Sequence, residues 1–158
     1  MSVATQRSSA ERTGGLYVVV IDLRCDLTLR VGALGERSLT AGWYVYVGSA
    51  RRGLRARVAR HRRREERLRW HIDYLTTQAE CEVVEAVELI DAGIDECALC
   101  RALRDGLSAT VPIRRFGASD CAGGCGAHLL HVSERPDHHR IQALAAAGAG
   151  APRCRPLS

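Results

Sequence analysis

Four side chains in the first half of this 158-residue chain have types and spacings suited to phosphodiester hydrolysis. Tyr17 and Tyr46 lie in apolar, β-branched segments that predict neighbouring strands, so their hydroxyls could converge on one sheet face. Arg57 and His61 are four residues apart and would share one face of a helix. A guanidinium can clamp two phosphate oxygens, and an imidazole can act as a base or proton shuttle.

Each of these residues also fits an ordinary structural role when it is taken alone. Tyrosines pack within strands, and the arginine and histidine fit a generic basic surface. A phenol with a pKa near ~10 is a poor base at neutral pH unless a metal ion or an arginine lowers that pKa. The combination of the four residues is therefore what favours a catalytic site.

A carboxylate downstream could complete such a site. Glu96 shares a helix face with three core-type residues, so it should point toward the sheet rather than solvent. A carboxylate there could bind one Mg²⁺ or Mn²⁺, with water and phosphate filling the other positions. Asp95 and Glu88 remain alternatives, since an acid at a helix N-terminus is also favoured by the helix dipole.

Arginines are concentrated in one strip of the chain. Ten of them lie within residues 51–69 against two glutamates, and the chain contains no lysine. The strip carries a net charge of +8 within a total of +5, so the rest of the chain is mildly acidic. This pattern favours binding to a phosphate backbone, although a solvated helix face is the alternative. The residues expected to contact nucleic acid are Arg51, Arg52, Arg55, Arg60, Arg63, Arg64 and His71.

A second group of potential metal ligands lies in a glycine-rich segment. Cys121, Cys125, His128 and His131 have the spacing C-x3-C-x2-H-x2-H, which resembles a zinc site without matching a standard finger. The preferred interpretation is a glycine-rich turn with buried thiols that enters a strand.

The pattern of apolar residues predicts a small α/β (α+β) fold. Strands of a mainly antiparallel three-stranded central sheet are expected at residues 16–23, 27–31 and 42–48. Residues 81–89 favour another strand over a helix, and a further short C-terminal strand is expected at 128–132. Flanking helical segments are expected at residues 53–64, near 71, at 94–107 and at 141–147.

The order and spacing of several motifs resemble the GIY-YIG nuclease superfamily. Residues 15–17 (Gly-Leu-Tyr) and 46–48 (Tyr-Val-Gly) are similar to its two naming motifs, and Arg57 followed by His61 is similar to its helix pattern. Residues 70–75 (Trp-His-Ile-Asp-Tyr-Leu) are similar to the branch called Uri-type endonucleases. Residues 117–121 (Gly-Ala-Ser-Asp-Cys), followed by His128 and Leu129, resemble the closing motif of that branch.

The resemblance implies a metal-dependent endonuclease that hydrolyses phosphodiester bonds in DNA, including branched or damaged DNA. It further implies that one tyrosine orients or deprotonates water and that Glu96 holds the Mg²⁺ or Mn²⁺ ion. The sequence does not indicate which of the two tyrosines acts on the water. Asp73 could either line the site or cap a helix. The two other hypotheses are a catalytically silent nucleic-acid-binding module of the same fold and a zinc-stabilised interaction domain.

The composition of the chain predicts one domain between two tails. Residues 1–14 are expected to be a disordered tail, residues 15–134 a GIY-YIG-like domain, and residues 135–158 a short helix with a flexible tail. The absence of a secretory signal predicts a cytoplasmic protein with free thiols, and the longest apolar run is too short to cross a membrane. So small a domain has little room for a separate module that recognises particular DNA sites. A protein partner that supplies specificity is therefore a further possibility.

Overall fold

A four-stranded antiparallel sheet forms the centre of the protein, in the order β5-β1-β4-β6. Its strands are Gly15–Leu23 (β1), Gly42–Ala50 (β4), Cys81–Leu89 (β5) and Leu129–Val132 (β6). The computed structural model describes residues 13–64, 66–118, 121 and 123–150. The tail expected at residues 1–14 therefore lies mostly outside the described residues. None of the helices in this described part is long and apolar enough to cross a membrane.

The expected three-stranded central sheet is wrong in its number of strands and in one member. Leu27–Arg30 (β2) pairs with Glu36–Leu39 (β3) in a separate two-stranded sheet, with a single turn of 3₁₀-helix at Gly32–Leu34 (η1) between them. Both edges of β1 are already occupied, by β4 on one side and β5 on the other, so β2 has no edge of β1 to join.

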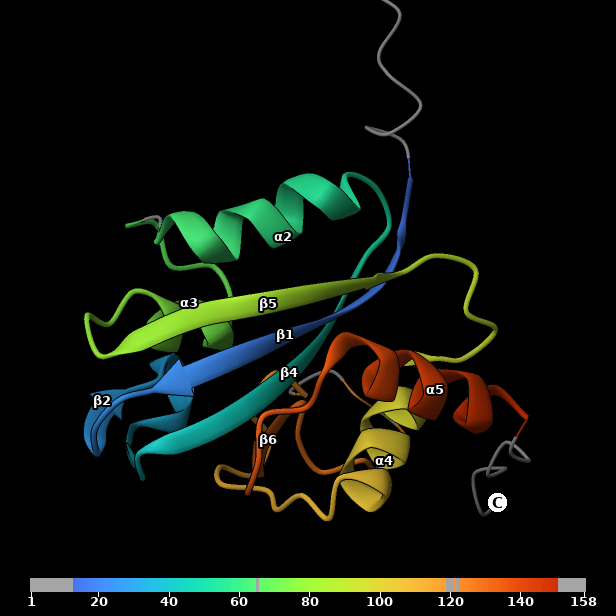
Figure 1. Ribbon diagram of the computed structural model, residues 1–158. Helices are drawn as coiled ribbons and strands as arrows, with labels where there is room; N and C mark the ends of the chain where they lie inside the picture. The colour runs from blue at the N-terminus through green and yellow to red at the C-terminus, as the bar shows by residue number, and fades with distance from the viewer. Residues whose placement is uncertain (1–12, 65, 119–120, 122, 151–158) are drawn as a thin grey trace, which may run out of the picture.

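Helices cover both faces of the main sheet (Figure 1). Leu54–Arg63 (α2) and His71–Thr76 (α3) pack on one face, and Glu96–Gly106 (α4) and His138–Ala149 (α5) pack on the other. Because both faces are covered, residues 17–21 of β1 are buried without a break, which explains the continuous apolar run in the sequence.

The helix boundaries are set by local capping. Asp95 accepts a hydrogen bond from Ala98 N (2.7 Å), so α4 begins at Glu96 rather than at residue 94. Asp137 does the same for Arg140 N (2.7 Å), and α5 therefore begins before Ile141. Ile141 is fully buried, and α5 packs against α4 and β5.

Candidate active site

Four of the five predicted catalytic residues line one cavity of about 650 Å³. Tyr17 comes from β1, Tyr46 from β4, Arg57 from α2 and Glu96 from the first turn of α4. The fifth, His61, is buried behind Tyr17 and contacts it directly. Folding thus brings together side chains that are far apart in the sequence. This cavity is the cleft.

The cleft lies where one edge of the sheet opens. β6 pairs with residues 43–46 of β4, and Val47 N then donates to His128 O (2.9 Å). Beyond this point β6 does not pair with β4, and the first turn of α4 approaches it instead. Ser49 Oγ donates to Glu96 Oε2 across this gap (2.9 Å). The open end of β4 therefore lets a helix on one face of the sheet contribute to a site on the other.

Two glycines make room for the two tyrosines. Gly48 lies opposite Tyr17 in the β1–β4 pair, and an added Cβ there would lie 2.3 Å from Tyr17 Cζ. Gly117 has a φ of +70°, and its added Cβ would lie 2.9 Å from Tyr46 Cε2. The ring centroids of the tyrosines are 6.4 Å apart. The glycine of the Tyr-Val-Gly motif is therefore a packing requirement of the tyrosine in the neighbouring strand.

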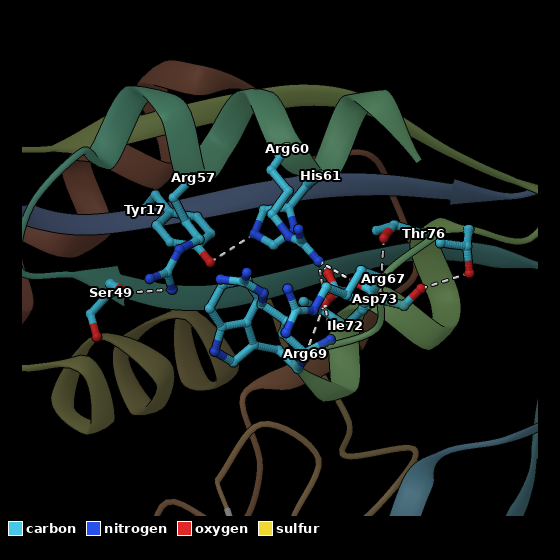
Figure 2. Close-up of polar contacts among 12 residues, drawn as sticks. Tyr17, Ser49, Arg57, Arg60, His61, Arg67, Arg69, Ile72, Asp73 and Thr76 are labelled. Carbon is cyan, nitrogen blue, oxygen red and sulfur yellow. Dashed lines mark hydrogen bonds and ion pairs between the residues drawn. The ribbon is translucent and has the colours of Figure 1, made fainter. Parts of the chain in front are cut away.

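Tyr17 and His61 form a buried polar pair. The Tyr17 hydroxyl lies 2.8 Å from His61 Nε2, as Figure 2 shows, and the two share a hydrogen bond. Burial raises the pKa of Tyr17 above its usual range, and the charge of Arg57 opposes that shift. Burial lowers the pKa of His61 to about 4, against a smaller opposing effect of Asp73. His61 is therefore neutral at pH 7, and its unprotonated ring nitrogen can accept the hydrogen bond of the phenol.

The buried, neutral His61 predicts a pH dependence of stability. In the unfolded chain its pKa returns to about 6.5, so below that pH only the unfolded state takes up the proton. The contribution of His61 is fully present above pH 6.5 and is lost as the pH falls toward 4. We expect a loss on the order of 3 kcal/mol in the free energy of unfolding. Urea denaturation over this pH range, in wild type and His61→Gln, measures it.

The control for this prediction is His139→Gln, because His139 is exposed on α5 and water hydrates it in both states. That variant should keep the wild-type dependence on pH, whereas His61→Gln should flatten it. Equal slopes for wild type and His61→Gln would show that His61 takes up its proton over the same pH range in the folded and the unfolded chain, against this prediction.

A cation–π contact and a hydrogen bond hold Arg57 at the cleft. Its guanidinium carbon lies 3.9 Å from the ring centroid of Trp70, a cation–π arrangement. Nη1 donates to the Ser49 carbonyl oxygen (3.3 Å), as Figure 2 shows. Its charge also acts on Tyr17, so the guanidinium lies where it can reach both the phenol and a bound phosphate. Trp70, expected only as a family marker, is thus the platform for Arg57.

Arg60 and Asp73 make polar contacts with each other and with nearby backbone groups. Arg60 Nη2 lies 3.1 Å from Asp73 Oδ2 and also donates to the Arg67 carbonyl oxygen, and the Arg60 side chain is only 11% exposed (Figure 2). Asp73 Oδ2 accepts from the backbone N–H of Arg69 (2.8 Å) and Trp70 (3.0 Å). Of the two roles considered for Asp73, capping of α3 is the one it has in the structure.

Glu96 presents a carboxylate to the cleft. Its side chain is 30% exposed, and its Oε1 lies 3.1 Å from His128 Nδ1. Burial alone would lower the pKa of His128, but the adjacent Glu96 carboxylate outweighs it and raises that pKa to about 9. A carboxylate has about four lone-pair sites. Two are directed at Ser49 and His128, which leaves acceptor capacity for a further ligand.

The two alternative acids lie differently. Asp95 also lines the cleft, but one of its oxygens caps α4. Glu88 lies on β5 opposite Tyr17 and is not among the residues that line the cleft. Glu96 is consequently the acid that combines exposure to the cleft with freedom from a capping role.

Most of the predicted backbone-binding arginines lie on the surface. Arg51, Arg52, Arg55, Arg63 and Arg64 are all exposed. Arg64 donates to the Cys81 carbonyl oxygen (2.9 Å), so part of its capacity is used within the fold. Arg69 also lines the cleft and was not among the residues singled out from the sequence, because nothing distinguishes it from its neighbours in the arginine strip.

His71 lies on the cleft wall and holds a loop in place. Its Nδ1 accepts a hydrogen bond from Gly117 N (2.9 Å), and its ring lies 5.6 Å from that of Phe116. Burial lowers the pKa of His71, which agrees with a ring nitrogen that acts as an acceptor. Ser119 and Asp120 of the same loop lie outside the described residues.

The structure separates one member of the proposed cysteine and histidine set from the others. His131 of β6 has its ring 4.8 Å from that of Tyr44, whereas His128, immediately before the strand, lines the cleft. Residues three apart in a strand point to opposite faces, so both histidines could not serve one site. Cys97 of α4 instead joins Cys121 and Cys125, and their three sulfurs lie within 4.8 Å of one another. No sequence spacing linked Cys97 to the other two.

The fold and the cleft define a mixed α/β domain with an antiparallel sheet covered on both faces and a polar site at one open sheet edge. Residues 16–149 match the family described as a domain of unknown function, DUF123, and the chain belongs to that family. Comparisons with curated proteins and with solved structures find no match.

Proposed function

We propose that this protein is a metal-dependent endonuclease of the GIY-YIG type, in its Uri-type branch, which hydrolyses phosphodiester bonds in DNA. One observation carries the proposal: Tyr17, Tyr46, Arg57 and Glu96, from four separate elements, line one cleft. Phosphodiester hydrolysis needs a base near water, positive charge near the phosphoryl oxygens and stabilisation of the leaving oxygen. These residue types supply each of those functions within one cavity.

Tyr17 is the residue we propose to act on the attacking water. Its hydroxyl is joined to His61 Nε2 (2.8 Å), whereas no such partner is found for the Tyr46 hydroxyl among the described residues. Tyr17 would accept a hydrogen bond from the attacking water while its own hydroxyl donates to the neutral imidazole, so the pair would orient that water. Tyr46, whose ring lies against those of Tyr17 and Phe116, would position the water and the first phenol.

Arg57 would hold the scissile phosphate. A guanidinium offers two parallel N–H donors to phosphate oxygens and remains charged at any physiological pH. The Trp70 ring lies 3.9 Å away and limits the rotation of that group, so fewer conformations are lost when the phosphate binds.

The donor atoms at Glu96 fit Mg²⁺ or Mn²⁺. These ions prefer carboxylate oxygen and are commonly held by one or two protein carboxylates, with water and substrate phosphate completing the shell. When bound, the ion would stabilise charge on the leaving oxygen. Ser49 and His128 fix the orientation of the Glu96 carboxylate before any ion arrives.

The exposed arginines that follow β4 would bind the DNA backbone. Arg52 and Arg55 lie two and five residues after the end of β4, the strand that carries Ser49 of the cleft wall. Replacing both by alanine should weaken binding to DNA of any sequence and reduce the slope of log K against log salt by about two. Fluorescence anisotropy with a labelled duplex at several salt concentrations measures this slope.

A double variant outside the cleft provides the control. Arg30 and Arg37 are exposed on β2 and β3, outside the cleft, and their replacement by alanine should leave the slope unchanged. If Arg52 and Arg55 prove no different from this pair, the surface around the end of β4 does not contact DNA.

The direct test is cleavage of labelled linear, nicked, branched and damaged oligonucleotides with Mg²⁺ or Mn²⁺, against the same reactions with a chelator. Metal-dependent products support the proposal. DNA binding without cleavage of any substrate would identify a silent binding module instead. We further propose a cytoplasmic location, and a protein partner for specificity, because the domain is small. Recovery of such a partner by affinity capture from cytosol would test that part.

A further inference from the structure

Three cysteines that are distant in the sequence meet beside the cleft. Cys97 lies in the first turn of α4, whereas Cys121 and Cys125 belong to the loop that leads into β6. Their Sγ atoms all lie within 4.8 Å of one another, and those of Cys121 and Cys125 are 3.5 Å apart. Two elements thus direct three thiols at one point.

These separations fit metal ligands better than a disulfide. Sulfurs bound to one tetrahedral zinc ion at about 2.3 Å lie ~3.8 Å from each other. A disulfide holds its sulfurs about 2.05 Å apart. The Cys121–Cys125 distance of 3.5 Å is close to the first value and far from the second.

The surrounding backbone is shaped to this cluster. A Cβ added at Gly123 would lie 2.6 Å from Cys97 Sγ and 3.6 Å from Cys121 Sγ, so the loop passes directly over the sulfurs. Arg101 Nη1 donates to Cys97 Sγ (3.3 Å) and to the Gly123 carbonyl oxygen (2.9 Å). A positive charge beside the thiols would offset the negative charge that thiolates bring.

His128 offers a fourth ligand. Its side chain lies beside Cys121 and is buried, with 3% of the residue exposed. Among the described residues its ring nitrogens make no hydrogen bond of good geometry, although Nδ1 lies 3.1 Å from Glu96 Oε1. Nδ1 faces the Glu96 carboxylate, which leaves Nε2 for a metal, as is common for zinc-bound histidines. Only the three thiols lie within 4.8 Å of one another, so the imidazole would close on the ion as it binds.

We propose that Cys97, Cys121, Cys125 and His128 bind one structural Zn²⁺ ion. Binding would release the protons of the thiols and of the His128 imidazolium, and would fasten the loop that leads into β6 to α4 at Cys121, Cys125 and His128. That loop carries Gly117 and His128 of the cleft wall, so the ion would fix this side of the cleft. The site is distinct from the carboxylate proposed for Mg²⁺, and its existence does not depend on nuclease activity.

The ligand chemistry selects zinc over the harder ions. Thiolate and imidazole ligands suit zinc, whereas Mg²⁺ and Ca²⁺ are bound through oxygen. Cys100, one turn further along α4, donates to the Ala127 carbonyl oxygen (3.1 Å), and its sulfur is not part of the cluster. A three-cysteine, one-histidine set is a known composition for a closed structural zinc site.

The experiment measures metal in the full-length protein. Protein produced in zinc-supplemented medium and purified with a non-chelating reductant should contain about one zinc ion per chain by plasma mass spectrometry. Cys97→Ser and Cys121→Ser should lose that zinc, and a chelator should lower the Tm of the wild type. Cys81→Ser is the matched control, because Cys81 is a buried cysteine of β5 outside the cluster and should keep the zinc.

Cobalt provides a readout that needs no variant to fold. Wild-type protein exchanged into Co²⁺ should show the intense sulfur-to-cobalt absorption and the visible bands of a tetrahedral thiolate site. A wild type that binds no zinc from excess metal, or Cys97→Ser protein with unchanged zinc, would overturn the proposal. So would iron together with acid-labile sulfide, which would identify an iron–sulfur cluster.

Discussion

Arg57→Ala protein should cleave DNA about 10²- to 10³-fold more slowly than wild type at saturating Mg²⁺. The reason is the position of the guanidinium, which lies over the Trp70 ring and donates to the Ser49 carbonyl oxygen on the wall of the cleft. Loss of the stacked cation should cost only about 1 kcal/mol of stability, so the fold should survive. Single-turnover cleavage of a labelled substrate measures the rate, and circular dichroism checks the fold.

Two further variants separate charge, geometry and location. Arg57→Lys keeps the charge but loses the planar pair of donors, so its rate should fall between those of wild type and Arg57→Ala. Arg62→Ala is the matched control, because Arg62 is exposed on the same helix outside the cleft. An Arg57→Ala protein that cleaves at the wild-type rate would remove this residue from the proposed site.

Glu96→Gln protein should lose metal-dependent cleavage by about 10²-fold or more and should no longer respond to added Mg²⁺ or Mn²⁺. Glutamine retains the size of the side chain and can still accept from Ser49, but it has no negative charge for the ion. The dependence of the single-turnover rate on metal concentration, in wild type and variant, measures the effect.

Asp95→Asn is the control for this substitution. Asp95 lies next to Glu96 in the sequence and also lines the cleft, and asparagine is as good an N-cap as aspartate. This variant should therefore retain both the fold and the response to metal. If Asp95→Asn loses the metal response while Glu96→Gln keeps it, Asp95 and not Glu96 is the metal ligand.

These two predictions test different parts of the same cleft. If Arg57→Ala and Glu96→Gln are both inactive while DNA binding persists, the hydrolytic role of the cleft is supported. If wild type is itself inactive on every substrate, the zinc proposal still stands or falls on metal content alone, because its measurement does not use cleavage.

The sequence by itself determined the local elements and the residue types of the site. The apolar run at β1, the aromatic strand at β4 and the apolar spacing of α4 each depend on neighbours within a few residues, so their patterns are readable without a structure. Spacing alone grouped His128 with His131 in one candidate zinc set, although alternation along the strand predicted at residues 128–132 places them on opposite faces.

The tertiary structure alone decided which of these elements meet. Alternation tells which face of a strand is buried but not which strand lies beside it, and this is why β2 was placed in the central sheet and β5 was not. The same limit applies to side chains: no spacing in the chain connects Cys97 with Cys121, or Trp70 with Arg57. Long-range packing sets those contacts, because both faces and both edges of β1 must be covered at once.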